Sequence, residues 1–261
     1  MTRLPSVFSS HGAPTLPIDA SMPSAEFATL ASRLPRPRAI LMLSAHWGTA
    51  QPVASTATRP ETIHDFYGFP RALYELRYPA PGAPELGAIA TELLAAGGIP
   101  ASTAEHGLDH GAWVPLLLMF PQADVPVAQL SIQPRLDAAH HYRVGRALRA
   151  LREDGVMIVG SGQITHNLRA ADFSARPEDA DPRVTEFTDW FEARLAERDI
   201  SALLDYRRRA PHAALMHPTD EHLLPVFSAL GAASDDFTLG IQSLGTFQKS
   251  LAMTNYVFSD A

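Results

Sequence analysis

The chain has 261 residues, a formal net charge of -7 with neutral histidines, and no cysteine. Hydrophobic residues make up 46% of it, which is enough for a large buried core and excludes disordered, collagen-like and coiled-coil classes. The length fits one α/β domain over residues 1–261. The acidic balance, without a block of like charges, argues against a nucleic-acid or anionic-membrane surface.

The sequence predicts no membrane span and no secretion signal. The longest apolar stretch, residues 112–120, is too short to cross a bilayer and contains Pro115. Residues 1–5 lack the apolar core of a signal peptide, so we expect a cytoplasmic protein. The absence of cysteine excludes disulfides, thiolate nucleophiles and cysteine-type zinc sites. A homodimer is the default expectation for a soluble oligomer.

Short apolar runs alternate with segments of helical periodicity along the chain. The runs predict buried strands at 39–43, 125–132 and 156–159. The helical patterns lie at 84–96, 137–152, 182–198 and 219–230. Residues 237–258 alternate weakly, which predicts closing antiparallel strands. Strands that alternate with helices predict an α/β fold, with a central mostly parallel or mixed sheet and helices on both faces.

Three histidines stand at the ends of predicted strands. They are His11 after the apolar start at 7–8, His46 after 39–43, and His166 after 156–159 and a Gly-Ser-Gly turn. Open α/β sheets bind ligands outside the carboxyl ends of their strands, so these side chains are placed to converge. Neutral imidazole is the commonest metal-binding side chain, and the set therefore predicts a metal site.

Two further segments are rich in histidine. His217-Pro-Thr-Asp-Glu-His222 has the proline and acidic residues of a helix start, where Glu221 and His222 would project about 100° apart. The segment from His106 to Gly111 contains His110 and two glycines, which favour a loop that approaches a ligand closely.

Other candidate residues have simple packing explanations. His140 and His141 fall in a predicted helix, where at least one must face solvent, and His212 is similarly explained as a surface residue. Four aromatic residues are candidates for a substrate pocket or for ordinary packing: Trp47, Tyr67, Phe69 and Trp113. The chain lacks the dinucleotide-binding, P-loop, His-Glu-x-x-His and Gly-x-Ser-x-Gly motifs, which disfavours nucleotide cofactors and serine hydrolysis.

Six motifs in order carry a family resemblance that spans residues 6–258. They are Ser-His-Gly-Ala-Pro at 10–14, Ser-Ala-His-Trp at 44–47, the segments 64–70 and 108–115, Gly-Ser-Gly-Gln-Ile-Thr-His-Asn at 160–167, and 217–225. Together they resemble the DODA-type, class III extradiol ring-cleaving dioxygenases, the group related to the LigB subunit. The resemblance implies a LigB-like fold.

The same resemblance implies a metal held by His11, His46 and His222. In the wider superfamily the third ligand is often a glutamate, which leaves Glu221 as a rival to His222. His166 would lie beside the metal, as an acid/base group or as a fourth ligand. His110 would be a second histidine near bound dioxygen or substrate.

The implied reaction is oxygen insertion next to the hydroxyls of a catechol such as 3,4-dihydroxyphenylalanine, by 4,5-cleavage. Fe(II) in a three-ligand facial set suits this chemistry, whereas Zn²⁺, the metal we expect to find in such a site, has no redox chemistry. A neutral His166 could accept a catechol proton. Two other readings of the same histidines stay open: a zinc-dependent hydrolase that activates water, and a non-catalytic LigB-like binding protein.

Overall fold

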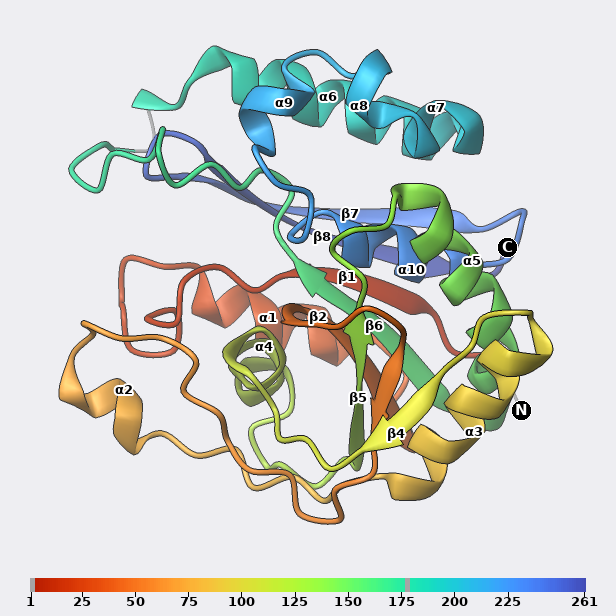
Figure 1. Ribbon diagram of the computed structural model, residues 1–261. Coiled ribbons are helices and arrows are strands. Elements are labelled where there is room, and N and C mark those ends of the chain that lie inside the picture. The colour runs from red at the N-terminus through yellow and green to blue at the C-terminus, as the bar shows by residue number, and fades with distance from the viewer. Residues whose placement is uncertain (1–2, 177–178) are drawn as a thin grey trace.

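An eight-stranded mixed sheet forms the centre of the structure (Figure 1). The computed structural model describes residues 3–176 and 179–261. The strand order is β4-β3-β5-β2-β6-β1-β8-β7. The strands are β1 (Ser6–Ser10), β2 (Ala39–Gly48), β3 (Val53–Ser55), β4 (Ser102–Ala104), β5 (Val127–Ile132), β6 (Val156–Gly162), β7 (Thr238–Phe247) and β8 (Leu251–Ser259).

The four central strands run parallel. β1 pairs with β6, β6 with β2, and β2 with β5, so the carboxyl ends of all four meet at one edge of the sheet. Every residue of β1, β5 and β6 is buried, as expected for strands covered on both faces. The β7–β8 hairpin closes the sheet antiparallel to β1, as the weak alternation at 237–258 predicts.

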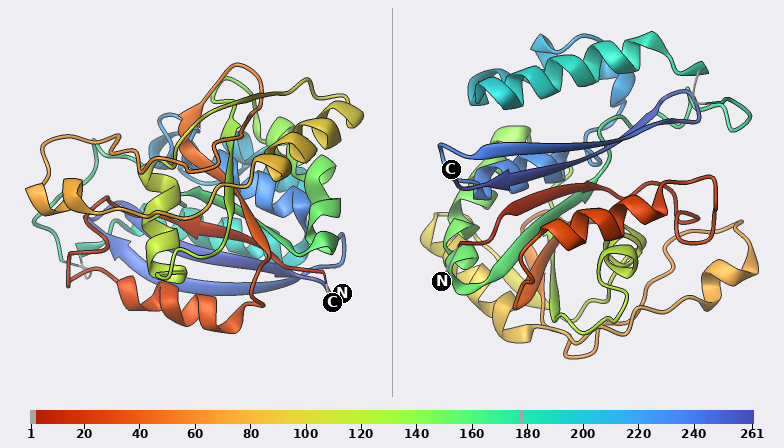
Figure 2. Two further views of the ribbon diagram at one scale, coloured as in Figure 1. Left: turned by 90° about the horizontal axis from the view of Figure 1, so that it is seen from below. Right: turned by 180° about the vertical axis from the view of Figure 1, so that it is seen from behind.

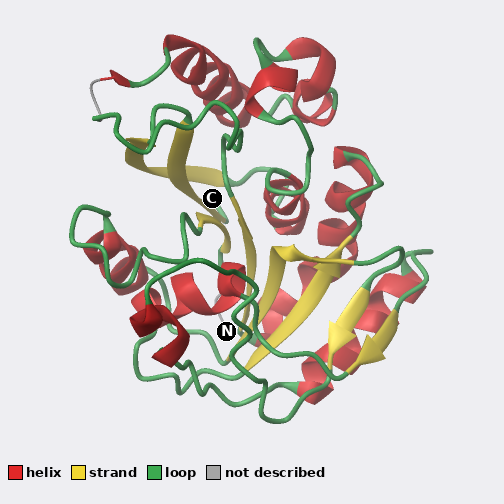
Figure 3. Ribbon diagram, turned by 60° about the vertical axis from the view of Figure 1, so that its left-hand side comes forward, coloured by secondary structure: helices red, strands yellow, loops and turns green. Residues whose placement is uncertain are grey.

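Helices cover both faces of the sheet, which confirms the predicted fold class (Figures 2 and 3). One face carries α1 and α4, and the other carries α3, α5 and α10, with α6 packed against β8. No described helix is long and apolar enough to cross a membrane. The helices are α1 (Ser24–Arg33), α2 (Arg71–Glu75), α3 (Pro84–Ala96), α4 (His110–Met119), α5 (Ala138–Leu148), the 3-10 helix η1 (Arg149–Asp154), α6 (Pro182–Glu197), α7 (Ile200–Leu204), α8 (Tyr206–Arg209), α9 (Ala213–Met216) and α10 (Leu224–Ala232).

Helix boundaries differ from the sequence predictions at two positions near the histidines. The predicted helix at 219–230 begins only at Leu224, where Pro225 occupies the first turn, so His222 lies in the preceding turn. At the second position, the loop predicted over residues 106–111 ends before His110. α4 begins at His110 because the Asp109 side chain caps it, accepting a hydrogen bond from the Ala112 backbone N–H at 3.1 Å.

The expectation that His140 or His141 faces solvent is wrong, because both are buried. His141 donates from Nδ1 to the Asp137 carbonyl at 2.9 Å and accepts the Gln133 backbone N–H at Nε2, at 3.1 Å. His140 Nε2 lies 2.9 Å from the Gln133 side-chain oxygen. Burial is tolerated because each ring has hydrogen-bond partners, which helical periodicity does not reveal.

Candidate metal centre

Five histidines gather at the carboxyl ends of the parallel strands and line one pocket of about 680 Å³. His11 follows β1, His46 lies near the end of β2, and His166 follows β6 by four residues. His110 is the first residue of α4, and His222 lies in the turn before α10. The structure brings the three strand-end histidines to one pocket, as predicted, and His110 and His222 from other segments line the same pocket.

His46 lies inside β2 and not beyond it, contrary to the prediction that the strand ends at residue 43. β2 pairs with β5 in regular register through Ser44, and the register then shifts before Gly48. His46 therefore lies in the part of β2 where the regular pairing with β5 is interrupted. The Gly-Ser-Gly run at 160–162, expected as a turn, is likewise the last part of β6.

Two glycines allow close packing around the histidines. A Cβ atom at Gly162 would lie 2.0 Å from the His222 carbonyl oxygen, so only glycine lets the turn that carries His222 pack on the end of β6. A Cβ atom at Gly111 would lie 2.4 Å from Ser44 Oγ and 2.9 Å from His46 Cδ2. These positions bring the segments of the site into contact.

His11, His46 and His222 form the group best suited to hold a metal. One ring nitrogen of each lies within 4.8 Å of those of the other two, and the Nε2 atoms of His11 and His46 are 3.1 Å apart. Burial and the neighbouring imidazoles hold the pKa of His11 well below its ordinary value and lower that of His46 to about 2. Burial also lowers the pKa of His222. The three rings are therefore neutral and can offer lone pairs.

A contact with Ser161 determines which ring nitrogen of His11 carries the hydrogen. Ser161 Oγ donates its hydrogen to the Gly111 carbonyl, so it accepts at 3.0 Å from His11 Nδ1. This leaves the lone pair of His11 on Nε2, the nitrogen that faces His46.

Carboxylates face the Nδ1 atoms of the other two rings, His46 and His222. His46 Nδ1 lies 3.5 Å from Asp65 Oδ2, and His222 Nδ1 lies 3.2 Å from Glu221 Oε1. Burial opposes ionisation of both acids, but a hydrogen bond with His110 lowers the pKa of Asp65 to about 2, and one with His222 lowers that of Glu221 to about 2. An ionised carboxylate only accepts, so it favours hydrogen on both Nδ1 atoms and leaves the lone pair of each ring on Nε2. Partners behind metal-ligating histidines act in this way in proteins.

Two other groups also satisfy the distance requirement for a metal. They are His46 with Asp65 and His110, and His166 with Glu221 and His222. In each, a carboxylate oxygen is already engaged by a ring N–H, which makes it an orienting partner of the histidines. The donor set that fits a metal best is therefore the three imidazoles.

His166 and His110 flank that set. The His166 ring lies parallel to that of His222, with centroids 3.5 Å apart, and burial with the nearby imidazoles lowers the pKa of His166 to about 3. The His110 ring centroid is 3.9 Å from that of His46, and its Nδ1 donates to Asp65 Oδ1 at 2.9 Å. A neutral His166 is a proton acceptor, and His110 adds a further polar group beside the metal set.

The segment that carries His166 is fixed to the one that carries His222. The Gln163 backbone N–H donates to the His222 carbonyl at 2.8 Å, and that of His166 donates to the Met216 carbonyl at 2.9 Å. His217 is fully buried outside the pocket, and its Nε2 donates to the Ile164 carbonyl at 2.7 Å. The second histidine of the 217–222 cluster thus joins the two segments and does not line the pocket.

Aromatic and apolar side chains form the walls of the histidine pocket. Of the four predicted aromatic candidates only Phe69 lines it. Trp47 stacks on His106, Tyr67 is 92% exposed, and Trp113 is buried in the core. The apolar lining residues that sequence reasoning missed include Phe66, Leu168, Phe173, Phe247 and Met253.

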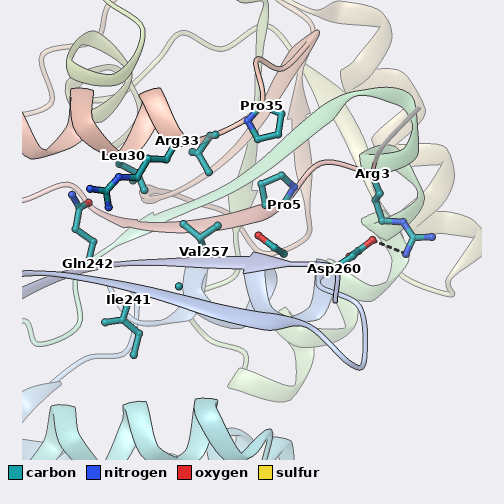
Figure 4. A pocket seen from close by; sticks show the side chains of 12 residues that line it. Arg3, Pro5, Leu30, Arg33, Pro35, Ile241, Gln242, Val257 and Asp260 are labelled. Atoms are coloured by element: carbon teal, nitrogen blue, oxygen red, sulfur yellow. Dashed lines mark hydrogen bonds and ion pairs between the residues drawn. The ribbon is translucent and has the colours of Figure 1, made fainter.

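A second pocket of about 380 Å³ lies far from this chemistry, between α1, the start of β1 and the β7–β8 hairpin (Figure 4). Arg3, Arg33 and Asp260 are its charged lining residues, and Arg3 is paired with Asp260. It contains no histidine and none of the predicted site residues.

Sequence reasoning missed Asp65 and Ser161 as partners of the histidines. Both lay in motifs singled out for other reasons, the aromatic segment at 64–70 and the Gly-Ser-Gly run. The available signal was a short polar side chain inside an otherwise apolar or aromatic segment. Their partners, however, are 19 or more residues away in the chain, and spacing could not identify them.

Comparisons with known proteins agree with this geometry. The family model described as the catalytic LigB subunit of aromatic ring-opening dioxygenase matches residues 7–259. The 4,5-DOPA dioxygenase extradiol of Beta vulgaris is 42% identical over 239 residues, covering 88% of this chain and 87% of that protein. The protein of the same name from Escherichia coli K12 is 38% identical over 258 residues, covering 97% and 93%.

A solved structure is also similar. The crystal structure of an uncharacterized Escherichia coli K12 protein aligns with a TM-score of 0.81 at 33% identity, covering 98% of this chain and 99% of that one. The names of the curated relatives support the dioxygenase prediction and give no support to a zinc hydrolase or a non-catalytic binding protein.

Proposed function

The chain belongs to the LigB family of aromatic ring-opening dioxygenases and is an extradiol catechol dioxygenase, and we propose that its substrate is a catechol such as 3,4-dihydroxyphenylalanine, cleaved at the 4,5 position. Both atoms of O₂ enter the product. The ring bond that breaks joins a hydroxyl-bearing carbon to its neighbour without a hydroxyl. The product is a ring-opened semialdehyde.

The observation that carries the proposal is the convergence of three neutral imidazoles in an aromatic pocket. We propose that His11, His46 and His222 hold the metal through Nε2, since each Nδ1 faces an acceptor. Fe(II), when bound by a three-ligand facial set, keeps positions open for substrate and O₂ and supplies the redox chemistry, which Zn²⁺ does not. The same three donors suit Zn²⁺ geometrically.

His166 is the proposed proton acceptor for a catechol hydroxyl. Its lowered pKa of about 3 keeps it neutral at pH 7, and its ring lies directly beside His222. Ionising the catechol makes the ring more electron-rich and ready for oxidation, and the protonated His166 can later return the proton. His110, whose Nδ1 hydrogen bonds to Asp65, is proposed to contact substrate or O₂ from the other side of the metal set.

The pocket suits a small aromatic substrate. Its volume of about 680 Å³ lies within the ordinary range for small-molecule sites, and Phe66, Phe69 and Phe247 offer ring faces and edges. The histidines provide the few polar groups that orient such a ligand.

The test is oxygen consumption by the metal-loaded protein. The protein is loaded with Fe(II) under nitrogen and mixed with air-saturated buffer containing a panel of catechols that includes 3,4-dihydroxyphenylalanine. We expect one O₂ consumed per yellow ring-opened product, and no reaction by Zn²⁺-loaded protein. Confirmed iron loading without oxygen uptake with any catechol would overturn the proposal.

A further inference from the structure

Asp65 contacts two histidines that come from different elements. Its Oδ1 accepts from His110 Nδ1 and from the His110 backbone N–H, both at 2.9 Å, while its Oδ2 lies 3.5 Å from His46 Nδ1. His46 comes from the end of β2 and His110 from the start of α4. The Asp65 carboxylate therefore contacts a histidine from each of these two elements.

The backbone that carries Asp65 is itself anchored to the same region. The Trp113 indole N–H donates to the Ile63 carbonyl at 2.9 Å, and Thr62 forms a parallel bridge with Leu108. After Asp65, Phe66 packs against the core cluster that contains Trp113, whereas Tyr67 is 92% exposed. The backbone on the N-terminal side of Asp65 is therefore anchored, while the Asp65 side chain is 24% exposed.

We propose that Asp65 is the positioning residue that orients His46 and His110 together, so that the Nε2 lone pair of His46 faces the metal centre. This inference rests on the proposed function, because it takes His46 as a metal ligand. Oδ1 accepts from His110 Nδ1, and Oδ2 is the oxygen that faces His46 Nδ1, so the carboxylate favours hydrogen on the Nδ1 atoms of both histidines. If His46 instead carried its hydrogen on Nε2, that N–H would point toward His11 Nε2, 3.1 Å away, and could not bind a metal.

Replacing Asp65 by asparagine tests this directly, because an amide has one accepting oxygen and one donating nitrogen. In Asp65→Asn the oxygen can keep the hydrogen bonds of His110, but the NH₂ group then faces His46 Nδ1. His46 must turn or move its hydrogen to Nε2, and either change weakens metal binding. Asp65→Glu keeps two accepting oxygens and should restore part of the affinity.

The readout is metal affinity and needs no turnover. Zn²⁺ dissociation constants are measured by competition with a chromogenic chelator, and the absorption spectrum of Co²⁺-loaded protein reports the ligand geometry. We expect Asp65→Asn to weaken Zn²⁺ binding about 10- to 100-fold and to alter the Co²⁺ spectrum. Asp19→Asn is the matched control, since Asp19 lines the same pocket and its carboxylate, among the described residues, hydrogen bonds only to Ser21; this variant should bind Zn²⁺ like wild type.

Each outcome separates the alternatives. Asp65→Asn with wild-type Zn²⁺ affinity overturns the inference. So does a loss of affinity accompanied by a fall of more than about 3 °C in the metal-free melting temperature that Asp65→Glu does not restore, because that pattern marks a structural role. Wild-type protein that binds no metal in the same assay contradicts the proposed metal centre itself.

Discussion

The imidazoles of His166 and His222 are stacked, with ring centroids 3.5 Å apart and an angle of 12° between their planes. His222 Nδ1 is engaged by Glu221. By contrast, within residues 3–176 and 179–261 no hydrogen bond involves the ring nitrogens of His166. The stack therefore places a free proton acceptor against a proposed metal ligand.

Replacing His166 by glutamine should separate proton transfer from metal binding. Glutamine has no basic nitrogen, so we expect kcat to fall about 10²- to 10⁴-fold while the iron content stays near that of wild type. Turnover is measured by oxygen uptake and iron by elemental analysis of the same sample. Equal losses of iron and turnover would instead make His166 a fourth ligand.

The third ligand is decided by comparing His222→Ala with Glu221→Gln. Removing His222 deletes a ligand, and we expect stoichiometric metal binding to be lost. In Glu221→Gln the glutamine oxygen can still accept from His222 Nδ1 in place of Glu221 Oε1, so this variant should keep stoichiometric metal binding. Titration with Zn²⁺ measures both. The opposite order of losses would identify Glu221 as the ligand.

Gly111→Ala should displace the His46 ring and so weaken metal binding. Its added Cβ would lie 2.9 Å from His46 Cδ2, which forces the ring to shift. We expect metal affinity to fall at least about tenfold and stability to decrease by about 1–3 kcal/mol. Gly240→Ala is the control, because there the nearest contact of a Cβ is 3.4 Å and lies far from the site. Unfolding in urea and metal titration measure the two effects, and unchanged metal binding in Gly111→Ala would contradict the packing argument.

His141 should make the metal-free protein sensitive to acid. Burial lowers the pKa of His141 to about 4, and its Nε2 accepts a backbone N–H, so a second proton has no acceptor. The folded pKa lies below the unfolded one, so the contribution is fully present above about pH 6.5 and is lost as the pH falls toward 4. Its size is about 3 kcal/mol.

Because other buried histidines titrate in the same range, the measurement is a difference. Urea unfolding with chelator present is followed from pH 7 to pH 4.5 for wild type and for His141→Gln. We expect the variant to be less stable at pH 7 and to lose less stability as the pH falls. Parallel curves for the two proteins would show that His141 does not contribute to the acid sensitivity.

The sequence predicted the elements whose pattern is local. The helix at 84–96 has the predicted bounds, and the helices predicted to start at 137 and 182 begin at Ala138 and Pro182, each after a capping aspartate. Prediction failed where tertiary contacts override periodicity. The turn at 218–223 packs His222 onto the end of β6, and His140 and His141 are buried because side chains and backbone outside their helix satisfy them.

The sequence by itself predicted that His11, His46 and His166 lie at one edge of the sheet, because alternation of strands with helices favours parallel strands whose carboxyl ends meet. Only the tertiary structure decided which nitrogens face one another. That depends on Ser161, Asp65 and Glu221, each of which faces the Nδ1 atom of a histidine in the site. Ser161 and Asp65 meet their histidines across the fold, and a hydrogen bond depends on distance in space and not on spacing in the chain.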